Sequence, residues 1–299
     1  MNRASFIAAA ATFPFLPLNA SADGVGFAFD QITDIVGTLP LAQCEPGDFV
    51  SEWADYTQPD SGTGPDARRR WQEQRMRLLG TPERHYVTAT KWRSQILGGH
   101  PDTIVDSEAR TVTTIEHRTK SYRIDPIGER PTRNEYARRV LAGFVSPAVT
   151  VISQDTGERR VYGYPAQGYE YQAKIATTAG GRERDSAVNV KKYLSPYPRT
   201  RMSVGDVPVI FPYGFSAMLD ATDALILVAQ TGELGSSLTF SGPPIPLTLS
   251  YYEAVETFPK DPMSPGARVV KRGNFRPISD DDPAFSIPPD YTRSQSQSD

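Results

Sequence analysis

Apolar and polar side chains alternate along much of this chain, and the alternation is clearest between residues 150 and 178. From Tyr169 to Ile175 every second residue is Tyr, Ala or Ile, separated by Glu, Gln and Lys. A period of two is typical of a strand with one buried and one wet face. We expect a turn over 154–157 and a second break over 163–168. The stretch therefore predicts two strands of one β-hairpin.

The same alternation recurs on both sides of this hairpin. A turn is expected over 107–110, where the apolar pattern is interrupted. Together the strands form an antiparallel meander followed by later strands. The further strands that the pattern predicts are 85–97, 103–105, 111–124, 247–252 and 268–275.

A period near 3.6 residues predicts three helices, over 65–79, 134–144 and 213–230. The second follows Thr132 and Glu135, which have the spacing of a capping box. The connections are expected to be irregular, and the Ser/Gln-rich tail to be disordered. These segments are a Gly-rich link over 177–185, a proline-dense crossing over 195–212 and the tail over 292–299.

The N-terminus has the pattern of an export signal. An apolar run over 4–18 is followed by the small residues Ala20, Ser21 and Ala22, which suit a signal peptidase. A membrane-spanning helix is the alternative, but the run is shorter than the roughly 20 residues that a bilayer requires, and two prolines interrupt it. We expect cleavage near Ala22 and a protein that is periplasmic or secreted. Cys44 is the only cysteine, so no internal disulfide can form.

Composition excludes one class of partner and fits a sheet-rich fold. Lys and Arg number 32 against 35 Asp and Glu, for a net charge of −3, so no basic field attracts nucleic acid. The 26 prolines and 14 tyrosines are typical of short strands joined by turns, with amphipathic aromatic side chains on a surface or in a cavity.

No motif points firmly to catalysis or to a cofactor. His85, His100 and His117 match no metal-ligand spacing, although His85 and His117 could meet across the sheet. Ser216 follows one glycine of a nucleophile elbow, but the second glycine is missing. The run 280–282 of three aspartates lacks the spacing of a calcium loop and predicts a solvated turn. We expect neither a metal nor another cofactor, and we favour a non-enzymatic protein over a serine hydrolase.

Three stretches carry a resemblance to a known family: ERRVYGYPAQGYEYQAKI, SGPPIPLTLSYYEAVE and DDPAFSIPPDY. From Tyr86 to Tyr291 the chain resembles exported bacterial proteins of unknown function related to the lipoprotein-carrier superfamily of the LolA and LppX type. The resemblance implies an α+β fold in which a curved, incompletely closed antiparallel sheet, a half-barrel, has helices packed on its concave face over an apolar cavity. The expected organisation is a signal peptide over 1–22, an N-terminal extension with one helix over 23–84, a half-barrel domain over 85–291 and the tail.

Aromatic side chains supply the candidate binding site. In the half-barrel they would line the concave face and contact a hydrophobic ligand such as a lipid or acyl chain, or they could form an ordinary core. A second functional hypothesis is an envelope scaffold that binds another protein through the loop over 195–212. The candidate ligand-binding residues are Tyr86, Trp92, Tyr122, Tyr169, Tyr171, Phe215, Met218 and Tyr251.

Overall fold

A single large β-sheet dominates the fold. The computed structural model describes residues 26–36, 40–57, 82–97, 100–127, 148–179, 182–198, 203–204, 207–208, 238–246, 248–258 and 267–294. The helices expected over 65–79, 134–144 and 213–230 lie outside these residues. Among the described residues, no helix is long and apolar enough to cross a membrane.

Thirteen of the described strands make up the sheet, in the order β12-β7-β8-β9-β13-β14-β1-β2-β3-β4-β5-β6-β15. Their bounds are β1 Gly26–Val36, β2 Glu83–Val87, β3 Lys91–Ile96, β4 Asp102–Asp106, β5 Thr111–Glu116, β6 Ser121–Pro126, β7 Ala148–Val161, β8 Tyr164–Ala179, β9 Arg182–Pro198, β12 Leu238–Ser241, β13 Thr248–Phe258, β14 Ala267–Ile278 and β15 Thr292–Arg293. The short strands β10 (Ser203–Val204) and β11 (Val207–Pro208) pair only with each other.

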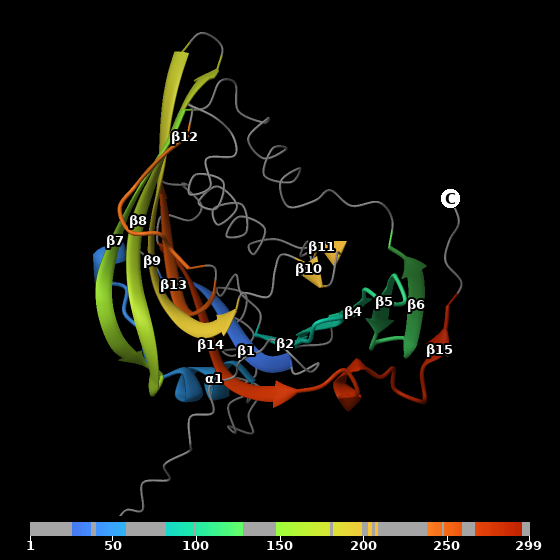
Figure 1. Cartoon of the computed structure of the whole chain (residues 1–299). Helices are drawn as coiled ribbons and strands as arrows, with labels where there is room; N and C mark the ends of the chain where they lie inside the picture. Colours follow the sequence, from blue (N-terminus) through green and yellow to red (C-terminus); the bar gives the residue numbers. More distant parts are fainter. Residues whose placement is uncertain are drawn as a thin grey trace, which may run out of the picture.

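The sheet is open and strongly bent. Its ends are the two-residue strand β15 and the four-residue strand β12, each parallel to its neighbour, and all other neighbouring strands are antiparallel. The long strands β7, β8 and β9 stand at one end of the bend and β4, β5 and β6 at the other, with β14, β1 and β2 between them (Figure 1). The expectation of a large, incompletely closed and mainly antiparallel sheet is therefore confirmed.

The predicted hairpin is present and is longer than its sequence pattern indicates. Strands β7 and β8 close at the pair Val161 and Tyr164, so the loop contains only Tyr162 and Gly163. Both loop residues have positive φ, 52° and 84°, as a type I′ turn requires. The turn expected over 154–157 is a β-bulge instead, in which Gly157 supplies the positive φ of 87° without reversing the chain.

Two stretches that we predict as single strands are hairpins. The stretch 85–97 contains β2 and β3, and its reversal is fixed by Thr88, whose hydroxyl accepts a 2.9 Å hydrogen bond from the Lys91 amide. The stretch 111–124 contains β5 and β6, which reverse over 117–120. Both reversals contain threonine, which is also common in strands, and neither contains Gly or Pro to mark the turn.

The connections differ in how well they match expectation. The turn over 107–110 is confirmed, with Arg110 in a left-handed conformation. The link expected over 177–185 consists largely of paired strand, because β8 and β9 remain in register as far as Ala179 and Arg182. The crossing expected over 195–212 likewise begins inside β9. The tail begins with strand β15 rather than with a disordered segment.

Strand β1, which lies within the segment expected as an N-terminal extension, pairs within the sheet. Strand β1 lies near its middle, between β14 and β2, so a boundary at residue 84 would divide neighbouring strands. Helix α1 (Phe49–Thr57) lies on the outer side of the bend (Figure 1). The 3₁₀ helix η1 (Leu41–Gln43) precedes it, and Leu41 packs in one cluster with Tyr193 of β9. Phe49 packs over Gly273 of β14, where a Cβ atom would overlap its ring.

Candidate functional site

The register of the strands divides their side chains between two faces. Tyr169 of β8 lies opposite Lys192 of β9, which lies opposite Glu253 of β13. We call the face that carries these side chains the inner face. The neighbouring residue Tyr193 points to the other side, the outer face, against which residues 40–57 pack.

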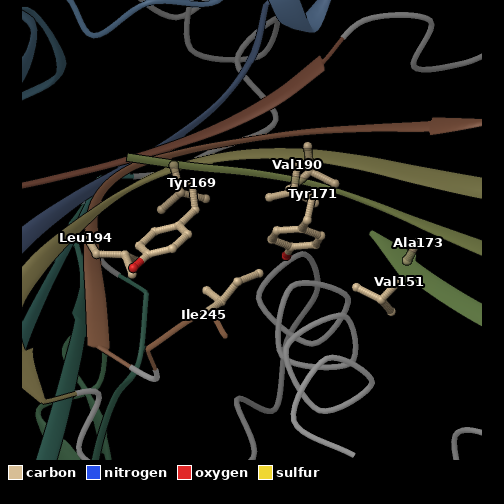
Figure 2. Packing of buried hydrophobic residues seen from close by; sticks show 9 residues of the cluster. Val151, Tyr169, Tyr171, Ala173, Val190, Leu194 and Ile245 are labelled. Atoms are coloured by element: carbon tan, nitrogen blue, oxygen red, sulfur yellow. The ribbon is translucent and has the colours of Figure 1, made fainter. Parts of the chain in front are cut away.

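An apolar patch covers the inner face where β7, β8, β9, β13 and β14 run side by side. All of its members are at least nine-tenths buried. Tyr169 and Tyr171 project from β8 to the same side as Ile245, which follows β12 (Figure 2). The patch consists of Val151, Tyr169, Tyr171, Ala173, Val190, Leu194, Ile245, Val255 and Val270.

A second apolar patch continues the inner face across β1 to β4. Phe29 stacks on His85 of β2, with ring centroids 4.9 Å apart, and on Phe275 of β14, at 5.5 Å. Val87 and Trp92 form a cross-strand pair beside them. The buried apolar members are Phe27, Phe29, Val87, Trp92, Val105 and Ile127. The inner face is therefore apolar on both sides of β14.

A buried charged cluster lies between these two patches. The ammonium group of Lys192 is 3.0 Å from Oε1 of Glu253, and the hydroxyl of Ser250 donates a 3.1 Å hydrogen bond to Oε2 of the same carboxylate. Arg272 donates through Nε to Gln31 Oε1 and through Nη1 to Ser250 Oγ, each at 2.8 Å. The side chains of Lys192, Glu253 and Arg272 are only 5%, 3% and 10% exposed. We call these five residues the charged cluster.

Burying the charged cluster costs free energy on folding. Removing ionised groups from water costs several kcal/mol each, and apolar side chains of similar volume often stabilise a protein as well or better. The Lys192 ammonium also lies 5.7 Å from the centre of the Tyr171 ring, which connects the charges to the first apolar patch. Ligand-binding sites typically have an apolar lining that contains a small number of polar groups.

Charged residues on the outer face have a structural role. Glu45 accepts hydrogen bonds from Lys191 and from Arg159, the latter at 2.8 Å, and Lys271 contacts Glu52 of α1. Partial burial raises the pKa of the Glu45 carboxyl, but the hydrogen bonds from Lys191 and Arg159 outweigh it and hold the pKa below its ordinary value. These contacts attach residues 40–57 to the sheet.

Cys44 belongs to the same outer contact. Its side chain is buried, and desolvation raises the pKa of the thiol above its ordinary value. Because the thiolate is the reactive form, a raised pKa makes this cysteine a packing residue rather than a nucleophile.

Of the six candidate ligand-binding residues that the structure describes, Trp92, Tyr169 and Tyr171 lie in the two inner-face patches. Tyr86 lies on the outer face, where its hydroxyl is 3.1 Å from Gln95 Oε1 and its ring contacts Phe285. The reason is the turn over 88–90, which places Tyr86 and Trp92 on opposite faces.

Two further described candidates, Tyr122 and Tyr251, lie elsewhere. Tyr122 of β6 pairs with Ile115 and is half-buried. Tyr251, at an irregularity of β13, stacks on Tyr164 with centroids 5.2 Å apart, and it is packed in a separate cluster with Cys44 and Val161. Phe215 and Met218 lie outside the described residues, as does Ser216 of the hydrolase hypothesis. The expected aromatic stripe is therefore not continuous.

The histidines do not converge. His85 lies 3.0 Å from Glu83, whereas His117 contacts Asp102 at 3.1 Å and Tyr291 at 2.8 Å. His100 is exposed. Within the part of the chain that the structure describes, no group of three His, Cys, Asp or Glu side chains could hold a metal ion.

The three aspartates of 280–282 form a turn with defined partners. Asp280 accepts hydrogen bonds from Thr88 and from Thr90, the second at 3.0 Å, so the turn is tied to the β2–β3 reversal. Asp282 accepts a 2.9 Å bond from the Ala284 amide and begins the 3₁₀ helix η3 (Pro283–Phe285). The carboxylates of Asp280 and Asp282 therefore hold the turn and the start of η3 in place.

Asp102 is a second buried carboxylate, and no sequence motif predicts its contacts. Three side chains contact Oδ2 of Asp102, which is 2% exposed: Arg93, Gln95 at 2.9 Å and His117. Arg93 also donates to the carbonyl of Ala284, so this group fastens the C-terminal segment to the sheet. The only sequence signal is the placement of charged residues at alternate positions of predicted strands.

Comparison with family models, with curated proteins and with solved structures finds no match to this chain.

Proposed function

We propose that this chain is a non-enzymatic, extracytoplasmic binding protein that carries or senses a hydrophobic ligand, such as a lipid or acyl chain, on the inner face of its sheet. The observation that carries the proposal is the apolar patch around Tyr169 and Tyr171 on the inner face, which is the face of the open sheet opposite residues 40–57. A curved sheet presents a concave surface without requiring a further domain, and tyrosines offer apolar area with a polar end.

The finer parts of the proposal come from the sequence. We place a signal peptide over 1–22, and helices over 134–144 and 213–230 on the inner face, where Phe215 and Met218 would contact the ligand. The half-barrel would then resemble the lipoprotein-carrier superfamily in shape. The apolar character of both inner-face patches supports this arrangement, because a sheet face of this kind must be covered by protein or by ligand.

Two tyrosine substitutions test the proposal. Tyr169 and Tyr86 are similarly buried, at 8% and 7% exposure, but lie on the inner and outer faces. We expect Tyr169→Ala to weaken binding of the uncharged probe N-phenyl-1-naphthylamine, followed by its fluorescence, several-fold. Tyr86→Ala should leave probe binding unchanged while lowering the midpoint of thermal unfolding.

The controls are circular dichroism of both variants and of the unmodified protein. Equal probe affinities in the three proteins, or no probe binding to the unmodified protein, would contradict the proposal. Capture of a stoichiometric envelope protein in the second case would favour the scaffold hypothesis instead.

A further inference from the structure

We propose that the charged cluster binds an acidic head group, so that the ligand of the inner face is an amphiphile with an apolar chain and a carboxylate. This inference rests on the proposed function and adds the chemical class of the ligand. Its basis is the position of Lys192, Glu253 and Arg272 between two apolar patches, on the same face of the sheet.

The cationic side chains of the cluster lie beside both apolar patches. Lys192 is the cross-strand partner of Tyr169, and its ammonium lies near the Tyr171 ring. Arg272 is the cross-strand partner of Gln31, which lies two residues from Phe29 on the same side of β1. An apolar chain on either patch would therefore end close to a cationic side chain.

Chemistry is the second argument. A guanidinium group offers a planar fork of donors that matches a carboxylate, and an ammonium group adds a compact positive charge. Ser250 and Gln31 orient Arg272 through two 2.8 Å hydrogen bonds. Glu253 lies 3.0 Å from the Lys192 ammonium and 4.0 Å from Nη1 of Arg272, so it positions both cations. Because these groups are already desolvated and oriented, they recognise an anion with little further rearrangement.

Energetics is the third argument. A buried ion pair is weak evidence for stability, because apolar replacements are often neutral or stabilising. Structural ion pairs on the outer face attach residues 40–57, through Glu45 and Glu52. The charged cluster lies on four adjacent strands, β9, β13, β14 and β1, whose backbones also pair with one another. Recognition of a ligand is the role that we assign to it.

The chain supplies matched controls for the test. Lys191 and Lys192 are adjacent and both buried, but they lie on opposite faces, as do Lys271 and Arg272. Binding of palmitate and of its methyl ester would be measured by displacement of N-phenyl-1-naphthylamine. We expect the unmodified protein to bind palmitate more tightly than the ester.

We expect Lys192→Gln and Arg272→Gln each to weaken palmitate binding about tenfold, the loss typical of a charge-assisted hydrogen bond, with no change for the ester. Lys191→Gln and Lys271→Gln should change neither affinity. If the unmodified protein binds acid and ester equally, the head-group proposal fails while the apolar-ligand proposal stands. If it binds neither, both fail. The comparison of acid with ester needs no variant, so it decides the matter even if a substitution prevents folding.

Discussion

Removing the Asp102 carboxylate should be one of the most damaging single changes in this protein. The Asp102→Ala variant leaves Arg93, which is 5% exposed, with a buried charge, and it also removes the acceptor of Gln95 and His117. Breaking a buried pair by deleting one partner costs about 3–5 kcal/mol. Because globular proteins are stable by about 5–15 kcal/mol, this is a large fraction of the total.

The assay is urea unfolding followed by circular dichroism, with limited proteolysis of the native state as a second measurement. Arg93 also holds the carbonyl of Ala284, so cleavage should move into residues 279–294 before the rest of the sheet is attacked. The matched control is Asp290→Ala, which breaks the 2.8 Å contact with Lys120. Both side chains of that pair are more than half exposed, and such pairs contribute about 0–1 kcal/mol. A loss below about 1 kcal/mol for Asp102→Ala, or equal losses in the two variants, would show that the buried Asp102 carboxylate is no more important for stability than an exposed one.

Three further predictions concern the hairpin turn, the packing of α1 and the response to acid. Gly163→Ala should destabilise the protein by about 1–2 kcal/mol in urea unfolding, because Gly163 has φ of 84° and no neighbour within 4 Å, so only backbone strain is added. Gly273→Ala should cost about 1–3 kcal/mol by overpacking against Phe49, and a second substitution, Phe49→Leu, should recover part of the loss; no recovery would argue against this contact. Glu45→Gln should be less stable than the unmodified protein at neutral pH, and the difference should shrink as pH falls below the ordinary carboxyl value of 4.5. The sign follows because the pKa of Glu45 is lowered in the folded state, so its contribution is present above the unfolded pKa and is lost as pH falls through the folded one. A difference that grows in acid would contradict it.

The type of sheet could be predicted from the sequence, but the position of every strand and turn could not. The β7–β8 hairpin could be predicted because its second strand alternates cleanly over many residues. Strand β1 could not, because both of its faces are buried: Phe29, Asp30, Gln31 and Ile32 are all less than 9% exposed, and the pattern of one wet face is missing. The turn at Thr88 was hidden because threonine is also a common strand residue.

The candidate site was predictable only in part. Tyr169 and Tyr171 could be assigned to one face from their spacing alone. The charged cluster could not be found, because Gln31, Lys192, Ser250, Glu253 and Arg272 form no motif and meet only through the pairing of strands far apart in sequence. Tyr86 was assigned to the wrong face. The turn over 88–90 was not recognised, and a turn moves every side chain after it to the other face, so Tyr86 and Trp92 do not share a face.

Mass spectrometry of the purified protein shows whether the inner face binds an amphiphile. Protein purified from a bacterial envelope without detergent would be weighed under native conditions and then extracted with organic solvent. We expect a bound species of a few hundred daltons at near-stoichiometric amount, released by the solvent and identified as a long-chain acid. A native mass equal to that of the polypeptide alone, together with no uptake of added palmitate, would contradict the account.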